Sequence, residues 1–376
     1  MNPPITVASL TKGTKVRCGD LLFSWSATID SYIWNKGDAW LNQHIFRVSP
    51  SAEANKKYLY YVIKHVAPKL ADFDAHGSTM RHIKKESLGE KVYAPSVFEQ
   101  GLIATFLDRE TTKIDALIAE QQRLIELLQE KRQAVISHAV TKGLNPAIPL
   151  KDSGVEWLGE VPEHWDVAQL KYFSKSLPGF AFPSDGFVDD EDKWKLLRGV
   201  NVGVSSIRWD AAVYWGRESG DGLDRYELTP GDLVVGLDRP LIKEGLRVAR
   251  IKPEDCPCML LQRVAAVKGV QALSTDYLYY LLSSPFFVAH FEPETTGVSV
   301  PHISTGQIDS FVVPIPPPGE QAETVRFLSD ELAEIQRLVG ESKKSSEILQ
   351  ERRSTLISAA VTGQIDVRGL ALEVAA

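Results

Sequence analysis

The chain has 376 residues, of which 44% are hydrophobic and 24% charged, and its formal net charge is −7 at pH 7. This length exceeds what one hydrophobic core normally supports and predicts two or three domains. The sequence contains neither a transmembrane-length apolar run nor an N-terminal signal segment, so we expect a cytoplasmic protein without a membrane span. The three cysteines lack the paired spacing of a disulfide framework or a zinc site.

Residues 1–95 form the first predicted globular segment. Gly19 and Asp20 precede the apolar run LLFSWSATI, the tripeptide NKG indicates a turn, and residues 41–48 follow as a second strand. The segment KKYLYYVIKHV, residues 56–66, has apolar side chains at helical spacing. The whole segment carries 13 basic and 8 acidic side chains, so a basic face is possible here although the chain as a whole is acidic.

Residues 96–143 predict one long helix. Apolar side chains recur there at alternating steps of three and four, over about forty residues, which is typical of a coiled coil. Polar Glu110, Gln121 and Lys131 interrupt this seam and would fix its register and partner. An independent surface helix with an imperfect apolar stripe is the alternative. The seam residues predicted in this helix are Ile103, Leu107, Ile114, Leu117, Leu124, Leu128 and Val135.

Residues 144–316 repeat the pattern of the first segment at greater length. Gly231-Asp232 opens LVVGL as Gly19-Asp20 opens LLFSW, and the run from Tyr277 to Tyr280 matches the run from Tyr58 to Tyr61. A His-Ile pair follows each predicted helix. Eighteen residues precede the first Gly-Asp pair, against about eighty in the second segment, so we expect the first domain to be incomplete.

Residues 317–364 repeat the long helix 221 positions later, and residues 365–376 are left as a C-terminal tail. Eight of the thirteen residues at 129–141 are identical to those at 350–362. Such a widely spaced repeat indicates one domain plus one spacer used twice. Glu331, Ser342 and Arg352 interrupt the second seam at matching positions. Its predicted apolar residues are Leu328, Ile335, Leu338, Leu349 and Leu356.

Catalytic motifs are almost absent from the sequence. It has no Gly-rich phosphate loop ending in Lys-Ser/Thr, no His-Glu-x-x-His pair and no Gly-x-Ser-x-Gly elbow. The start, Asn2-Pro3-Pro4-Ile5, is similar to the Asn-Pro-Pro-aromatic loop of amino-methyltransferases. However, isoleucine replaces the aromatic residue and no Gly-rich cofactor loop accompanies it, so an ordinary chain start is the simpler interpretation.

Residues suited to duplex DNA gather in the second globular segment. Arginine and lysine neutralise phosphates or bind guanine edges, asparagine can read adenine, and hydroxyls in a turn suit a phosphate. Surface charges around a tryptophan-rich core are the competing interpretation. The candidate DNA-binding residues are Arg198, Asn201, Arg208, Arg217, Arg239, Lys243, Arg247, Thr296 and Ser299.

The whole pattern resembles the specificity (S) subunit of a type I restriction–modification enzyme. The resemblance rests on the Glu-Gln pairs at 99–100 and 320–321 with prolines before them, on the Phe-Leu pairs at 106–107 and 327–328, on the helix endings EKRQAVISHAVTKGL and ERRSTLISAAVTGQI, and on the segment SGVEWLGEVPEHW. It implies an α+β fold in which two mixed α/β target-recognition domains, residues 1–95 and 144–316, are separated by two long antiparallel coiled-coil helices, residues 96–143 and 317–364.

The resemblance also implies a function in phage defence. Such a subunit is non-catalytic, reads a bipartite target in double-stranded DNA, docks two methyltransferase (M) subunits and is joined by restriction (R) subunits. S-adenosylmethionine, ATP and Mg²⁺ would then belong to the partner subunits, and this chain would hold no cofactor or metal. The alternative is a coiled-coil scaffold, or a half-subunit that dimerises through its helices, with globular domains that bind protein instead of DNA.

Overall fold

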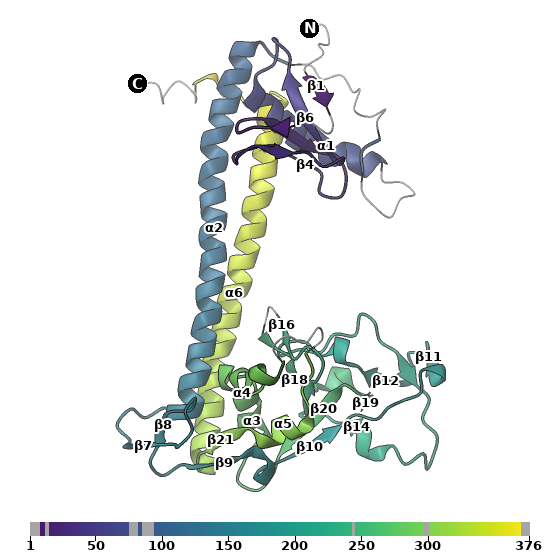
Figure 1. Cartoon of the computed structure of the whole chain (residues 1–376), viewed down its shortest axis with the longest axis vertical. Helices are drawn as coiled ribbons and strands as arrows, with labels where there is room; N and C mark the ends of the chain where they lie inside the picture. The colour runs from purple at the N-terminus through teal and green to yellow at the C-terminus, as the bar shows by residue number, and fades with distance from the viewer. Residues whose placement is uncertain are drawn as a thin grey trace. The chain divides into compact units, whose positions relative to one another are not determined.

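The computed structural model describes residues 8–11, 15–74, 82–84, 94–242, 245–295 and 301–369, so the Asn-Pro-Pro-Ile start lies outside the described residues. The chain divides into two compact units: unit 1 comprises Met1–Ile125 and Val339–Ala376, and unit 2 comprises Glu126–Leu338. Each unit contains one globular part and portions of the long helices α2 (Val97–Lys142) and α6 (Pro318–Val361), shown in Figure 1. Both predicted long helices are therefore confirmed, and the mixed helix and strand content agrees with the predicted fold class.

Unit 1 contains a small antiparallel sheet covered by helix α1 (Lys56–Asp74). The sheet order is β1-β6-β3-β4, and its register places Leu21 opposite Val48 and Phe23 opposite Phe46. These four apolar side chains are buried with residues of α1, and Leu22, between Leu21 and Phe23, is buried as well. The strands are β1 (Ala8–Thr11), β2 (Lys15–Val16), β3 (Leu21–Ser24), β4 (Asp30–Ile33), β5 (Ala39–Trp40) and β6 (Ile45–Pro50).

Unit 2 contains two larger sheets with the orders β10-β20-β15-β18 and β11-β13-β12-β19-β14. Three smaller strand pairs and helices α3 (Thr275–Leu282), α4 (Pro285–Thr295) and α5 (Thr305–Ser310) complete it. The strands are β7 (Leu150–Asp152), β8 (Glu160–Pro162), β9 (Asp166–Gln169), β10 (Ser174–Pro178), β11 (Phe187–Val188), β12 (Trp194–Leu197), β13 (Tyr214–Trp215), β14 (Glu227–Leu228), β15 (Leu233–Gly236), β16 (Leu241–Ile242), β17 (Gly245–Leu246), β18 (Val248–Arg250), β19 (Cys258–Leu260), β20 (Val264–Gly269) and β21 (Val312–Ile315).

The two globular parts share one strand framework. Strand β3 pairs with β4 and β6, and β15 pairs with β18 and β20 in the same registers; β1 lies on β6 as β10 lies on β20. The pair β2–β5 likewise matches β14–β19. The copies differ between the first two framework strands, where unit 2 has residues 179–226 with β11, β12 and β13, and unit 1 has residues 12–14. We call residues 179–226 the insert.

The two long helices have well-defined ends. At the start of α2, the Ser96 hydroxyl accepts the backbone N–H of Glu99, and the Glu99 carboxylate accepts the backbone N–H of Ser96, which is a capping box. Gly143 follows α2 and Gly363 follows α6, each with a φ of +72°. This left-handed conformation favours glycine and ends an α-helix.

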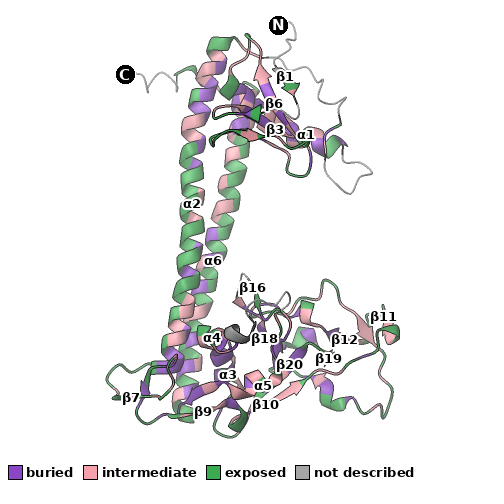
Figure 2. Cartoon of the chain, viewed as in Figure 1, coloured by how far each residue is buried: buried purple, intermediate pink, exposed green. Residues whose placement is uncertain are grey.

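The buried stripe of α2 departs from the predicted heptad seam. Buried, intermediate and exposed residues are interspersed along α2 (Figure 2). Leu117 and Leu124 are 51% and 42% exposed, whereas Ile125 is only 6% exposed, which corrects the assignment of both leucines to the seam. A straight α-helix drifts by about 20° per heptad, so a strict seven-residue repeat begun at Ile103 is displaced by about one residue after five heptads. The predicted Val135 is accordingly only partly buried, beside a fully buried Ile136.

The other predicted seam residues are at least partly buried. Ile103, Leu107, Ile114 and Leu128 in α2 and Leu328 and Ile335 in α6 are buried, and Leu338, Leu349 and Leu356 are half-buried. Of the polar seam positions, Ser342 is buried, Glu110 and Gln121 are half-buried, and Arg352 is exposed.

The helices run antiparallel within each unit. In unit 1, Ile103 shares a hydrophobic cluster with Ile357 and Ala360, while Asp115, further along α2, pairs with the earlier Arg353 of α6. In unit 2, the predicted polar seam residues Lys131 and Glu331 form an ion pair at 3.7 Å. The structure therefore brings together two of the polar positions that the sequence singled out.

Candidate nucleic-acid interface

A buried glutamine at the start of each long helix fastens the globular part to that helix. In unit 2, Nε2 of Gln321 donates to the carbonyl oxygens of Ala272 (2.6 Å) and Pro316 (2.8 Å), and its Oε1 accepts the N–H of Ser274 (2.9 Å). The side chain is 1% exposed. We call this arrangement the glutamine anchor.

Unit 1 has the same glutamine anchor. Nε2 of Gln100 donates to the carbonyl oxygens of Glu53 (3.0 Å) and Pro95 (2.9 Å), and Oε1 accepts the N–H of Asn55 (2.7 Å). Gln100 is fully buried. The Glu-Gln pairs noticed in the sequence thus have a structural role for their second member, because an amide buried without these partners would be costly.

A tyrosine of each globular part then contacts the last turn of the other long helix. Tyr58 of α1 donates to the carbonyl oxygen of Val361 in α6 (3.4 Å), and Tyr277 of α3 donates to the carbonyl oxygen of Val140 in α2 (3.1 Å). Burial raises the pKa of both phenols, so they remain donors at neutral pH. In both units the globular part is therefore held by the beginning of one helix and the end of the other.

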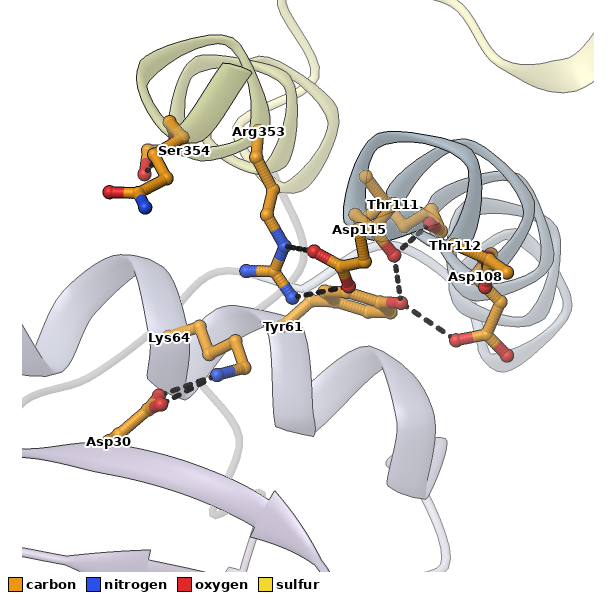
Figure 3. A network of polar contacts seen from close by, with 11 residues as sticks. Asp30, Tyr61, Lys64, Asp108, Thr111, Thr112, Asp115, Arg353 and Ser354 are labelled. Carbon is orange, nitrogen blue, oxygen red and sulfur yellow. Dashed lines mark hydrogen bonds and ion pairs between the residues drawn. The ribbon is translucent and has the colours of Figure 1, made fainter. Parts of the chain in front are cut away.

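Unit 1 adds a polar network between α1 and the two long helices, seen in Figure 3. The hydroxyl of Tyr61 donates to Asp108 at 2.8 Å and lies 3.1 Å from the hydroxyl of Thr111. Arg353 of α6 reaches Asp115 of α2 at 2.8 Å. These groups are engaged with one another, so we assign the network to the orientation of α1 on the helices.

Unit 2 has a group of four arginines near Arg247 and Asp238, just beyond the end of β15. Nη1 of Arg247 donates to the carbonyl oxygen of Asp238 (2.9 Å), and its Nε donates to the carbonyl oxygen of Val202 (2.8 Å). The carboxylate of Asp238 contacts Nη1 of Arg263 at 3.3 Å and Nδ1 of His302 at 2.7 Å. We define the arginine cluster as Arg208, Asp238, Arg239, Arg247, Arg263 and His302.

Positive charge dominates this cluster. Burial, and then the proximity of Arg208 and Arg239, lower the pKa of Arg247, while Asp238 opposes that effect. Arg208, Arg239 and Arg263 expose their side chains, whereas Arg247 is half-buried. Like charges held together and facing solvent are the arrangement that attracts a phosphate or another anion.

The backbone beside the cluster is strained. Arg239 has a φ of +45° and Arg263 a φ of +72°, conformations that cost a non-glycine residue about 1–3 kcal/mol each. Both residues flank Asp238, since Arg239 follows it in sequence and Arg263 pairs with it. Strain of this kind persists where the surrounding structure over-determines the backbone, and here it fixes the direction of both side chains.

The corresponding face of unit 1 is different. The shared strand registers place Asp30 of β4 where unit 2 has Arg247, and Ala27, with a φ of +61°, where unit 2 has Arg239. Asp30 pairs with Lys64 of α1 at 2.7 Å (Figure 3). The described part of unit 1 therefore has no arginine at either of these positions.

Two sequence candidates in the insert have structural roles. Asn201 is 2% exposed; its Oδ1 accepts the N–H of Arg198 (3.0 Å) and its Nδ2 donates to the carbonyl oxygen of Arg208 (2.8 Å), which closes the loop that carries both arginines. Arg198 in turn donates to the carbonyl oxygen of Ala211. Asn201 is consequently not available to read a base in this structure.

Arg217 is also occupied. Its guanidinium pairs with Asp221 (2.7 Å), Asp224 (2.6 Å) and Glu227, and it lies over the ring of Trp194. Arg217 holds the pKa of Asp221 at about 2. This charged group holds the loop that precedes β14, so the structure does not bring Arg217 into the arginine cluster.

The remaining candidates divide in two. Arg208, Arg239 and Arg247 belong to the cluster, whereas Lys243, Thr296 and Ser299 lie outside the described residues. Sequence reasoning missed Arg263, Asp238 and His302 as cluster members. The duplicated His-Ile pair was the available signal, because the backbone of each pair joins the strand framework: Ser26 bridges to His82, and Asp238 bridges to His302.

The described residues contain no group of three or more histidine, cysteine or carboxylate side chains that could hold a metal ion. No helix in the described ranges has the length and apolarity needed to cross a bilayer. The three cysteines have free thiols. Each globular part is held by the beginning of one long helix and the end of the other, and one of them carries a basic cluster; these are the features of a recognition protein.

Comparison with known proteins agrees with this class. The family model described as type I restriction modification DNA specificity domain matches residues 8–128 and 238–343, more than half of the chain. The chain therefore belongs to this family of specificity subunits, which are non-catalytic DNA-recognition components of type I restriction–modification systems.

Individual relatives show how far the similarity extends. The chain is 25% identical over 360 residues to the type I restriction enzyme MjaVIII specificity subunit of Methanocaldococcus jannaschii, a match that covers 93% of this chain and 80% of that protein. It is 33% identical over 208 residues to the EcoAI specificity subunit of Escherichia coli, covering 55% of this chain and 34% of that protein.

A solved structure shares the fold. A chain from a structural study of complex assembly and conformational transition in the type I restriction–modification system matches with a TM-score of 0.61 and 15% identity, covering 96% of this chain and 84% of that chain. This match supports the fold alone.

Proposed function

We propose that unit 2 reads one half of a bipartite duplex target, and that it does so with the arginine cluster and the adjoining insert. The observation that carries this proposal is a group of arginines beside Asp238: Arg208 and Arg239 lie near Arg247, Arg247 donates to the Asp238 carbonyl oxygen, and Arg263 pairs with its carboxylate. Exposed guanidinium groups neutralise phosphates and can bind guanine edges in the major groove. The insert lies beside them, because its residue Val202 accepts a hydrogen bond from Arg247.

Unit 1 would make the lesser contribution to base recognition. It has no counterpart of the insert in its sequence, and it carries Asp30 and Ala27 at the positions of Arg247 and Arg239. We therefore expect the methylated sequence to contain one well-specified half, read by unit 2, and a second half of lower information content. Methylome sequencing of cells that express this chain with its methyltransferase partner would give both halves directly.

Binding experiments should test the arginine cluster in the complete complex. A labelled duplex carrying the methylome target would be titrated with the chain and its methyltransferase partner at several salt concentrations. We expect Arg239→Ala and Arg208→Ala each to weaken binding and to lower the salt slope by about one if the side chain contacts a phosphate. Lys252→Ala is the matched control, because Lys252 is exposed beyond the opposite end of β18. Equal effects of all three substitutions would contradict the proposal.

We further propose that α2 provides a docking face for a methyltransferase subunit. Leu117 and Leu124 are 51% and 42% exposed, and their spacing of seven places them on one side of the helix. An exposed apolar stripe of this kind commonly marks a protein contact. Leu124→Glu should therefore abolish co-purification of the partner, and Ala119→Glu, an exposed position on another side of α2, should not. Retained co-purification with Leu124→Glu would refute the assignment.

The length of the helices would set the separation of the two half-sites. Helix α2 has 46 residues, or about 69 Å at 1.5 Å per residue. Inserting one helical turn into α2 near Leu124, with a matching turn in α6, should change the spacing in the methylated sequence and leave the bases read by unit 2 unaltered. Altered bases at unchanged spacing would contradict this role.

The chemistry would be performed by other chains in the cytoplasm. We propose that the methyltransferase subunits supply S-adenosylmethionine, and that restriction subunits supply ATP- and Mg²⁺-dependent cleavage. Equilibrium dialysis of the isolated chain against labelled S-adenosylmethionine should then show no saturable binding, and the same chain in complex should show binding. Saturable binding by the isolated chain would overturn this division of roles.

A further inference from the structure

Trp165 fills a position at the junction of α2 and α6 in unit 2. Its ring is fully buried, and Nε1 donates to Oε2 of Glu320 at 2.9 Å. The neighbouring His164 contacts Oε1 of the same carboxylate at 2.6 Å. The ring also packs against Gly143, where an added Cβ would lie only 3.1 Å from it. The Glu320 carboxylate at the start of α6 thus binds both His164 and Trp165 and holds the Trp165 ring against the end of α2.

The internal repeat places a pocket at the equivalent position in unit 1. Glu99 corresponds to Glu320, and the other matching lining residues correspond to the start of α6 and the end of α2 in unit 2. The pocket has a volume of about 480 Å³, which lies within the range of about 300–1,000 Å³ typical of ligand pockets. It is lined by Ala94, Pro95, Glu99, Ile103, Ala360, Val361, Thr362, Gly363, Ile365, Asp366, Val367 and Arg368.

No tryptophan of this chain occupies that pocket. All eight tryptophans lie within the described ranges, and none of them lines it. Trp165 of a second copy is an unsuitable occupant, because it is fully buried against Glu320 of its own unit. The repeat therefore specifies the chemistry of the occupant, an indole with an N–H donor.

Glu99 is suited to accept such a donor. Its Oε2 accepts hydrogen bonds from the hydroxyl and the N–H of Ser96. These bonds, with a further contribution from Arg368, lower the pKa of Glu99, so the carboxylate is ionised at neutral pH. In unit 2 the residue equivalent to Ser96 is Pro317, which has neither a hydroxyl nor an N–H, and Glu320 uses both oxygens for the His-Trp pair.

We propose that this pocket of unit 1 binds a tryptophan side chain presented by a peptide segment similar to residues 160–165 of this chain. The indole would enter between the start of α2 and the end of α6, with its N–H directed to Glu99. Binding there would join the two helix ends in unit 1 as Trp165 joins them in unit 2. The indole would lie against Ile103, Ala360 and Val361, which line the pocket.

A peptide of residues 150–169, labelled with fluorescein, is the probe for this pocket. We expect it to bind the full-length chain saturably in a fluorescence anisotropy titration. The Trp165→Ala peptide should bind about tenfold more weakly or worse, because buried tryptophans dominate such contacts. The Trp157→Ala peptide is the matched control, since Trp157 packs on Phe286 and Phe311 and not on Glu320. An absence of saturable binding, or equal loss with both peptides, would overturn the proposal.

Two substitutions in the chain complete the test. Glu99→Ala should weaken peptide binding by about tenfold, whereas Ser96→Pro, which reproduces the unit 2 sequence and frees Oε2, should strengthen it several-fold. Both substitutions remove the same capping box, so a structural loss at the helix start would weaken binding in both. Weaker or unchanged binding with Ser96→Pro, or unchanged binding with Glu99→Ala, would contradict a binding site in which Glu99 accepts the indole N–H.

Discussion

Replacing Gln321 with leucine would measure how strongly the glutamine anchor fastens unit 2 to α6. The substitution nearly preserves side-chain volume but removes the partners of the Ser274 N–H and of the carbonyl oxygens of Ala272 and Pro316. A buried polar group left without a partner costs about 1–3 kcal/mol. Leucine adds favourable apolar burial at a 1% exposed position, so we expect a net loss of about 2–4 kcal/mol in the local free energy of opening.

Native-state hydrogen exchange followed by mass spectrometry is the appropriate assay, because a two-unit chain need not unfold in one step. A loss of 2–4 kcal/mol corresponds to exchange about 30- to 1,000-fold faster. The faster exchange should appear in peptides that contain Ser274 and not in those that contain Asn55. Gln100→Leu is the matched control and should reverse the pattern. Unaltered exchange at Ser274 in Gln321→Leu would refute the anchoring role.

Three further predictions concern the helix seam, acid stability and the docking tyrosines. In urea titrations, Leu124→Gln should change the free energy of unfolding by less than about 0.5 kcal/mol, whereas Ile125→Gln should lower it by about 2–4 kcal/mol, because only Ile125 is buried. Equal losses would support the heptad assignment of Leu124. The pKa of Asp221 is depressed to about 2 in the folded chain, so its stabilising effect is present above about pH 4 and is lost as the pH falls toward 2. The fluorescence of Trp194, beneath Arg217, should change in that interval, and Arg217→Gln should abolish the change; a change that persists would point to another group. Tyr277→Phe should lower the stability of unit 2 by about 1 kcal/mol through loss of the bond to Val140, and a melting temperature equal to that of the unsubstituted chain would argue against docking through this hydroxyl.

The sequence predicted the long helices well because their signals are local and repeated. Apolar spacing, flanking prolines and a following glycine located α2 and α6 to within a few residues. The phase of the seam was predicted less well. Whether Leu124 or Ile125 faces inward depends on the small difference between 3.5 and 3.6 residues per turn, accumulated over several heptads, and on what the helix packs against.

The candidate interface was only partly predictable, since a residue type does not reveal its hydrogen-bond partners. Asn201 and Arg217 have the chemistry of base and phosphate contacts, yet backbone groups and carboxylates close to them in the fold occupy both side chains. Arg263 and His302 lie far from Arg239 in sequence and meet only at Asp238, through strand pairing that the sequence alone did not define.

The way in which Tyr58 reaches Val361 has a consequence for biosynthesis. The hydrophobic cluster of unit 1 joins Ile103 and Phe106 to Ile357 and Ala360, which a ribosome adds about 250 residues later. At a synthesis rate of about 5–20 residues per second, the N-terminal part of unit 1 must wait on the order of tens of seconds for the end of α6, which completes its hydrophobic cluster. Unit 2, formed by Glu126–Leu338, has all its parts before that moment. The second unit can therefore fold before the first, and truncations near the C-terminus should damage the N-terminal unit.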